Sequence, residues 1–284
     1  MVIDVHTHPL LFNIITESDE VLEYRKNQMG LYLSGRMDID WDLYLMKDAK
    51  IDKTVILGQD YSADDGRILV SNDEIKKVVD YSPEHFIGFA SVDPRNENAV
   101  DELNRAFDEL GLTGLHLNVS RLHIFPDDPR LWPLMEICEK KNKPVIFHSG
   151  YSWKPNTPAK YARPILFEDI ACAFPNLKMC LSHLGFPWWN EVIMMLMKYP
   201  NVYTDTATIY MDTSARYFDQ LFTKDMNINW LQNSFADKVM FGSNSPRWRP
   251  VRALAGIKEL PVREDVLEKI MGGNAMRFLG IKED

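Results

Sequence analysis

The sequence predicts an α/β fold in which residues 1–284 form one (β/α)8 barrel domain. At 284 residues, one α/β barrel is the usual single-domain solution. Eight short apolar runs alternate with longer segments of helical periodicity. Most runs are apolar at both odd and even positions, which is typical of parallel strands that helices cover on both faces. An open doubly wound sheet is disfavoured, because no Gly-x-Gly-x-x-Gly follows the first run.

The elements follow in chain order. The predicted strands are residues 2–8, 53–58, 86–92, 112–118, 144–148, 178–183, 201–206 and 238–243. The predicted helices are residues 41–49, 72–81, 97–110, 128–142, 167–174, 189–198, 217–235, 263–271 and 274–279. Two connections are long, residues 9–40 after the first strand and residues 150–165 after the fifth. In a barrel both follow the carboxyl ends of strands, where sites are built, so we expect them to form a lid or pocket wall.

Composition and charge exclude several classes of protein. A formal charge of −9 argues against a protein that binds the nucleic-acid backbone. The abundance of Trp, Phe and Tyr argues against disorder. No uncharged apolar run approaches the ~18 residues of a membrane span, and the N-terminus lacks a secretory signal pattern. With three cysteines and no Cys-x-x-Cys, a cytoplasmic protein is expected.

Four histidines lie at the ends of predicted strands. His6 and His8 flank Thr7 at the end of the first strand, where residues i and i+2 point the same way. His148 ends the fifth strand and His183 ends the sixth. One such histidine alone is more often a core residue, but in a barrel these four can converge. Neutral imidazoles suit zinc, manganese, iron or nickel, and three protein ligands with an open position are typical of catalytic zinc.

Three further histidines are less clear. His116 lies near the end of the fourth strand and is a candidate pocket residue. His85 precedes a strand at the opposite, stability-related end of the barrel, so we interpret it as structural. His123 lies in the loop after the fourth strand, where either a surface position or a pocket contact fits the sequence.

Several motifs in fixed order give the chain a family resemblance. The first is Ile3-Asp4-Val5-His6-Thr7-His8, and the others are residues 125–134, 144–150, 162–164, 174–178, 182–185, 199–203, 241–246 and 272–275. With these motifs the chain resembles the amidohydrolase-related (amidohydrolase 2) family of metal-dependent hydrolases and decarboxylases, over nearly its whole length. The resemblance implies a (β/α)8 barrel, a small-molecule substrate and, by analogy, a homodimer.

The resemblance also implies roles for particular residues. His6, His8 and His148 match the metal ligands of the family, with zinc as the expected ion and manganese, iron or nickel as alternatives. His183 matches a histidine that either binds metal or acts as an acid/base. Arg163 matches the pocket wall.

Two departures from the family pattern affect the chemistry. Asn244 stands where the family usually has an Asp that touches the metal and shuttles the proton, and an amide cannot accept a proton near neutral pH. His183 or Asp205 could carry the proton instead, the chemistry could be lost, or the Asn could be a deliberate inactivating substitution. On the fourth strand, His116 and Asn118 occupy positions where relatives often have Lys and His.

Three functions are therefore expected, in order. The first is metal-dependent hydrolysis of a lactone, amide or ester, with His183 stabilising the developing oxyanion. The alternative is non-oxidative decarboxylation of a small aromatic or unsaturated acid, which needs a proton donor but no activated water. The third is a catalytically silent or inactivated protein. The candidate substrate-binding residues are His116, Trp153, Trp188, Trp189, Trp248, Arg163, Arg247 and Arg249.

Overall fold

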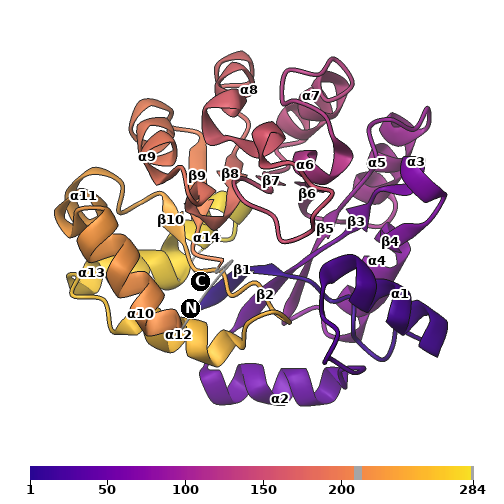
Figure 1. Ribbon diagram of the computed structural model, residues 1–284, viewed down its shortest axis with the longest axis horizontal. Helices are drawn as coiled ribbons and strands as arrows, with labels where there is room; N and C mark the ends of the chain where they lie inside the picture. The colour runs from indigo at the N-terminus through magenta and orange to yellow at the C-terminus, as the bar shows by residue number, and fades with distance from the viewer. Residues whose placement is uncertain (208–212, 283–284) are drawn as a thin grey trace.

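The computed structural model describes residues 1–207 and 213–282 and shows eight parallel strands in a nearly closed barrel, with helices around it (Figure 1). The barrel strands are β1 (Ile3–Thr7), β2 (Lys53–Leu57), β5 (Phe86–Ala90), β6 (Gly114–Leu117), β7 (Val145–Phe147), β8 (Met179–Leu181), β9 (Val202–Asp205) and β10 (Val239–Met240). They pair in this order from β1 to β10. Each lies within one of the eight predicted runs, so the barrel prediction is confirmed.

The two ends of the chain close the barrel. The N–H of Val5 donates to the carbonyl of Phe241 at 2.9 Å, just beyond β10. Further along, the N–H of Asn244 donates to the carbonyl of His6 at 2.9 Å. The N–H of His8 donates to the carbonyl of Ser245 at 2.7 Å. Strand β1 and the segment after β10 are therefore held side by side.

Helices connect the strands around the outside of the barrel. The longer ones are α1 (Asp19–Met29), α2 (Ile39–Ala49), α4 (Asn72–Tyr81), α5 (Ala99–Asp108), α7 (Trp132–Lys140), α9 (Trp189–Lys198), α11 (Ile228–Ser234) and α12 (Pro250–Lys258). The shorter ones are α3 (Ser62–Asp65), α6 (Val119–Leu122), α8 (Glu168–Ala173), α10 (Ser214–Asp219), α13 (Glu264–Glu268) and α14 (Asn274–Leu279). Within the described ranges, none is long and apolar enough to cross a membrane.

Several elements differ from the sequence-based expectation. Helix α12 follows β10, where no helix is predicted, and the predicted helix 217–235 is divided between α10, a π-helical turn over Gln220–Asp225 and α11. A small antiparallel hairpin of β3 (Gln59–Asp60) and β4 (Ile68–Val70) follows β2. The long segment after β1 is not an open loop, because α1 occupies a third of it.

Helix α1 is stabilised by its caps and by one buried cation rather than by an apolar face. The Ser18 side chain accepts from the N–H of Val21, and Gly30 ends the helix in the left-handed conformation. Arg25 is buried and donates to the carbonyls of Leu10, Ile15 and Leu69. Apolar periodicity is therefore weak here, which is why it predicts a loop.

An apolar layer fills the barrel beneath the site. Its members are Ile3, Val5, Val55, Leu57, Phe89, Ile146, Cys180, Tyr203 and Met240, with residues of α14. Along β7 and β9, the side chains two positions after this layer are those of His148 and Asp205. On β1 the pairing with β2 is irregular between Asp4 and Thr7. Such a bulge re-aims side chains, so that both Val5 and the adjacent His6 face the interior.

Candidate functional site

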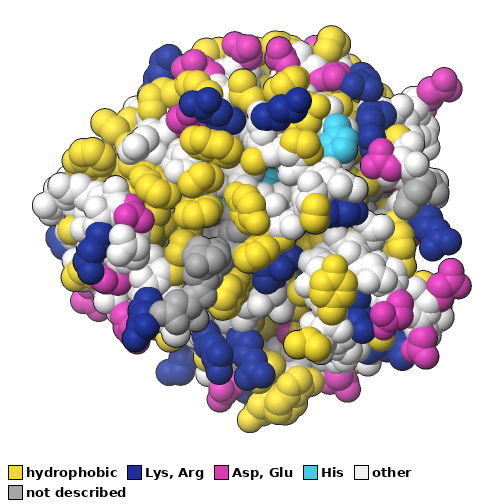
Figure 2. All heavy atoms as spheres, in the orientation of Figure 1, with side chains coloured by type: hydrophobic (Ala, Val, Ile, Leu, Met, Phe, Trp, Pro, Cys, Tyr) yellow, Lys and Arg dark blue, Asp and Glu magenta, His cyan; other side chains and the backbone are white. Residues whose placement is uncertain are grey.

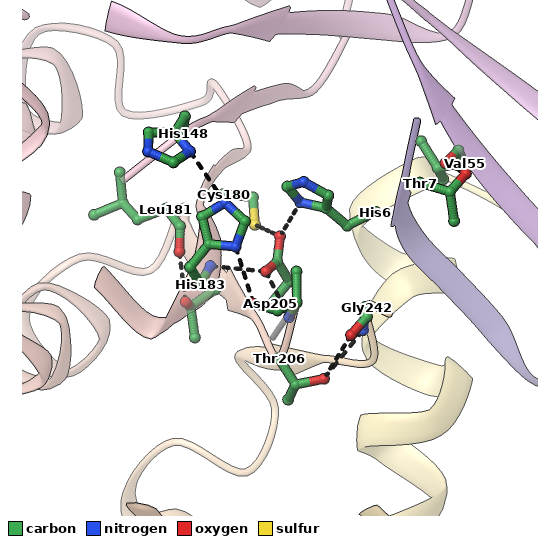
Figure 3. A network of polar contacts seen from close by, with 12 residues as sticks. His6, Thr7, Val55, His148, Cys180, Leu181, His183, Asp205, Thr206 and Gly242 are labelled. Atoms are coloured by element: carbon green, nitrogen blue, oxygen red, sulfur yellow. Dashed lines mark hydrogen bonds and ion pairs between the residues drawn. The ribbon is translucent and has the colours of Figure 1, made fainter. Parts of the chain in front are cut away.

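A cavity of about 220 Å³ lies at the C-terminal ends of the barrel strands. Five of the seven histidines of the chain contribute to its wall: His6, His8, His116, His148 and His183. Figure 3 shows the rings of His6, His148 and His183 turned toward one another above Asp205. The two histidines outside this group, His85 and His123, do not line the cavity.

A chain of hydrogen bonds fixes the tautomers of two imidazoles. His183 Nδ1 lies 2.9 Å from the carbonyl of Ala207, so this nitrogen must carry a hydrogen and Nε2 must be an acceptor. His148 Nδ1 lies 3.0 Å from His183 Nε2 and therefore donates to it. The lone pair of His148 is thus left on Nε2, which is buried and has no hydrogen-bond partner among the described residues.

His6 is oriented by a buried carboxylate. Its Nδ1 donates to Asp205 Oδ2 at 3.0 Å, which leaves its lone pair on Nε2. His6 Nε2 lies 3.3 Å from His8 Nε2. About 3.3 Å is also the separation expected of two nitrogens bound at 2.0–2.1 Å to one tetrahedral zinc ion. The side-chain nitrogen of Gln59 lies 2.8 Å from His8 Nδ1 and donates to it. The opposite orientation of this amide turns its oxygen to Nδ1, where it can accept the hydrogen that a metal-bound His8 carries.

The buried, unpartnered Nε2 of His148 and the converging Nε2 atoms of His6 and His8 fit a divalent metal ion. Among the described residues, however, His6, His183 and Asp205 are the only group of His, Cys, Asp or Glu whose potential ligand atoms all lie within 4.8 Å of one another, so His148 does not complete a compact set with His6 and His8 in this arrangement. Asp205, however, is fully buried and faces the side of His6 turned away from His8. Its other oxygen accepts from the N–H groups of His183 and Ala207. We therefore interpret Asp205 as the group that orients His6 rather than as a ligand.

Burial keeps these groups in the charge state that metal binding requires. It lowers the pKa of His116 to about 3 and that of His183 to about 4, and holds the pKa values of His8 and His148 well below 6.5. Burial alone would raise the pKa of Asp205. The adjacent His6 and the His183 N–H outweigh burial and hold that pKa well below its usual range. The site therefore presents the neutral imidazoles of His8, His116, His148 and His183 above one buried carboxylate.

Asn244 lies where the chain turns after β10 and lines the cavity. Its φ is +63°, in the left-handed region that Asn and Asp tolerate better than other side chains. Because the N–H of Asn244 donates to the carbonyl of His6, its position is tied to that of a proposed ligand. Its side chain supplies a neutral oxygen where the family pattern has a charged one.

His116, on β6, occupies a separate position beside the converging imidazoles. Its Nδ1 donates to the carbonyl of Gly58 at 2.8 Å, which leaves an acceptor on Nε2. Its ring centroid lies 6.4 Å from that of His6 and 6.1 Å from that of His8. The structure thus places His116 at the cavity wall, beside the presumed ion rather than among its converging ligands.

The predicted substrate-binding residues divide into two groups. Trp153 and Arg247 line the cavity, and the Arg247 guanidinium lies 5.8 Å from the Trp153 ring centroid. Arg163 does not line it, because its side chain is half exposed and pairs with Glu191. Trp188 lies beside Arg163, outside the cavity.

Three other sequence candidates also lie elsewhere. Trp248 and Arg249 line a different cavity, next to α2 and α12. Trp189 packs against the hydrophobic core. These residues follow strand ends in the sequence, but position after a strand does not determine which way a loop side chain turns.

Several cavity residues are absent from the sequence-based candidates. They are Gln28, Gln59, Tyr61, Asn118, Arg121, Tyr151 and Lys154, among others. Gln28 comes from the unpredicted helix α1, and Gln59 from the unpredicted hairpin. Arg121 and Lys154 do carry a signal in the sequence, since both follow barrel strands at the site end.

The chain is similar to known proteins over most of its length. The sequence profile of the family described as amidohydrolase matches residues 3–281. A curated relative, 2-amino-3-carboxymuconate-6-semialdehyde decarboxylase of Dictyostelium discoideum, is 30% identical over 241 residues, which cover 74% of this chain. The chain spans 65% of the length of that relative.

Two solved structures share the fold over nearly the full length. An uncharacterized TIM-barrel protein from Bordetella bronchiseptica has a TM-score of 0.77 at 24% identity and covers 98% of each chain. A dihydroxybenzoic acid decarboxylase from Polaromonas sp. JS666, with bound manganese and the inhibitor 2-nitroresorcinol, has a TM-score of 0.69 at 17% identity. That match covers 100% of this chain and 98% of the other.

Proposed function

The chain belongs to the amidohydrolase family, and from that premise we propose that it is a metal-dependent decarboxylase of a small aromatic or unsaturated acid. The sequence alone favours hydrolysis over decarboxylation. The relatives favour the second, because both the curated relative and the manganese-bound neighbour are named as decarboxylases. The residues of the site also favour decarboxylation.

The observation that carries the proposal is the lack of a carboxylate base in the cavity. None of the described residues that line the cavity is Asp or Glu. Asp205 lies below it, fully buried and held by His6, His183 and Ala207. The family pattern has an Asp at position 244 to shuttle the proton, and Asn244 cannot take a proton from water in its place. Decarboxylation needs a proton donor instead, and a cavity of imidazoles and cations also suits an anionic substrate.

In this proposal His6, His8 and His148 hold the ion, and Asp205 and His183 orient two of these ligands. A divalent ion at this position supplies positive charge that binds and orients a carboxylate and a neighbouring hydroxyl. Arg247 and Trp153 contact the ring or chain of the substrate. The acceptor Nε2 of His116 faces it as well.

The chemical step replaces a carboxylate by a hydrogen. A proton adds to the carbon that bears the carboxylate, the carbon–carbon bond breaks, and its electron pair returns to the substrate as CO2 leaves. We propose that His116 takes a proton from solvent on Nε2 and delivers it to this carbon, since His183 Nε2 is engaged by His148. A bound anionic substrate raises the pKa of the nearby His116, and the Gly58 carbonyl stabilises its protonated form.

The test uses the full chain, stripped with a chelator and reloaded with zinc or manganese. We expect close to one ion per chain by elemental analysis, and metal-dependent CO2 release from at least one member of a hydroxybenzoate and unsaturated-acid panel. Lactones, amides and esters are assayed in parallel. Hydrolysis of these compounds without CO2 release would overturn the proposal in favour of a hydrolase.

A silent protein gives a different result from either enzyme. It would show ligand-induced thermal stabilisation with no turnover on both panels. Metal content well below half an equivalent, not restored by added zinc or manganese, would contradict both catalytic functions.

A further inference from the structure

The cavity carries more positive charge than the binding of one carboxylate by a metal ion requires. Arg121, Lys154 and Arg247 all line it, with no acidic side chain among the described lining residues. Figure 2 shows Lys and Arg side chains among hydrophobic ones near the middle of this face, and acidic side chains mainly toward its edge. The charge balance therefore favours a ligand with more than one negative group.

Two of these cations meet at one neutral oxygen. Arg121 Nη2 and Lys154 Nζ both donate to Oε1 of Gln28, in the last turn of α1. The three residues come from segments far apart in the sequence, so this oxygen lies between two charges that the fold brings together. A carboxylate oxygen at this point would add charge–charge attraction to the hydrogen bonds that the neutral Gln28 oxygen accepts from both cations.

Arg121 is held in place by the surrounding structure. It is 9% exposed, and its guanidinium lies 4.1 Å from the centroid of the Tyr61 ring. Among the described residues, the hydrogen-bond partner of the Arg121 side chain is the neutral Gln28 rather than a carboxylate. A buried cation without a counter-charge is costly, so an anionic ligand would satisfy a group that the protein leaves unneutralised.

We propose that this cavity binds a small dicarboxylic acid. One carboxylate lies at the imidazole end, and the second lies between Arg121 and Lys154, where it displaces the Gln28 amide oxygen. The position of the first carboxylate rests on the proposed function, whereas the second site depends only on the three side chains. A cavity of about 220 Å³ limits the ligand to a single ring or a short unsaturated chain.

The direct test measures the binding of stable probes to the zinc-loaded protein by calorimetry. Benzoate carries one carboxylate, and isophthalate and terephthalate carry two at different spacings. We expect at least one dicarboxylate to bind ten-fold or more tightly than benzoate. Equal binding of all three, or a preference for benzoate, would overturn the proposal.

Two substitutions locate the preference. Gln28→Glu places a carboxylate where we propose that the ligand binds, so it should remove the dicarboxylate preference while benzoate binding changes less than three-fold. Arg121→Gln should do the same by removing one cation. The control is Arg263→Gln, which removes an exposed cation beside Asp265, far from the cavity, and should leave all affinities unchanged.

The outcomes also separate this inference from the proposed function. A dicarboxylate preference that persists in Gln28→Glu, which keeps both cations and is expected to fold, would show that the second carboxylate binds elsewhere and overturn the assignment. If the preference depends on Gln28 and Arg121 but no CO2 is released from any acid, the decarboxylase proposal fails and the dicarboxylate site stands. If CO2 is released but the probes bind equally, the dicarboxylate site fails and the decarboxylase proposal stands.

Discussion

His183 lies at the centre of the imidazole cluster, and its hydrogen bonds point to a positioning role. It accepts from His148 Nδ1 and donates to the Ala207 carbonyl, which together leave the lone pair of His148 on Nε2. Its backbone is left-handed, with φ +63°, and its N–H donates to Asp205. Both the side chain and the backbone of His183 thus fix groups that surround the proposed ion.

Paired substitutions test this role. His183→Gln keeps an oxygen that can accept from His148 but cannot carry a catalytic proton, so we expect normal metal content and turnover within about ten-fold of the natural chain. His183→Ala removes the acceptor and should lower metal affinity by roughly 10–100-fold. Metal titration and CO2 release are measured on both variants. A loss of more than about 100-fold in turnover by His183→Gln, with metal retained, would instead make His183 the proton donor.

Asn244 allows a second prediction at this scale. Because Asp tolerates the left-handed backbone nearly as well as Asn, Asn244→Asp should fold normally. The added negative charge beside three neutral imidazoles should tighten zinc binding by ten-fold or more. The matched control is Asn118→Asp, which adds the same charge elsewhere on the cavity wall. An equal gain in both variants would mean that the effect of Asn244→Asp is general rather than local.

At the scale of elements, the site depends on a close contact between the segments that follow β7 and β8. Gly150 has φ +87°, and a Cβ there would lie 2.3 Å from the carbonyl oxygen of Phe186. The neighbouring N–H of Tyr151 donates to that same carbonyl at 2.7 Å. This contact keeps His148 within reach of His183.

Gly150→Ala should therefore destabilise the protein by about 2–4 kcal/mol and reduce its metal content. Gly273→Ala is the matched control, since the nearest atom to its added Cβ is 3.8 Å away. Urea unfolding and elemental analysis of the two variants give the comparison. Full metal content in a stable Gly150→Ala protein would show that the contact between the two segments is dispensable.

The sequence predicts the barrel strands well because their signal is local. Each buried strand is a short apolar run, and the histidines at the ends of these runs do line one cavity. Helix α1 could not be found in this way, because its buried anchor is the charged Arg25. Its caps, Ser18 and Gly30, were nevertheless visible in the sequence.

The other differences between the sequence-based expectation and the structure concern the directions in which side chains point. The irregular pairing of β1 near His6 depends on the partner strand, which periodicity within one strand does not reveal. Arg163 follows a strand end, yet it turns toward Glu191 and away from the cavity. Charge pairing between distant segments decides such orientations, and no local pattern encodes it.

For the whole molecule, the buried imidazoles make stability depend on pH. The pKa of His116 is about 3 in the folded chain and near 6.5 in the unfolded chain. Between these values the unfolded chain binds more protons, so stability is full above pH 6.5 and falls as the pH is lowered. His183, with a folded pKa of about 4, acts in the same direction. Asp4 and Asp42, whose pKa values burial raises to about 6, act in the opposite direction.

His116→Gln isolates one contribution from this balance. Between pH 6 and pH 5, the metal-free natural chain should lose about 1 kcal/mol more unfolding free energy than the variant. Urea unfolding at the two pH values in the presence of a chelator measures the difference. Identical pH slopes would mean that His116 is not held neutral by burial.

The backbone hydrogen bonds between β1 and the segment after β10 have a consequence for when the site can be completed during synthesis. The ribosome makes His6 and His8 well before the turn at Asn244 that packs beside them. A nascent chain that stops before Val239 has the imidazoles but lacks the wall that holds them together. Metal capture is therefore expected to be a late, post-translational event, and an incomplete chain should release ions that the finished protein retains.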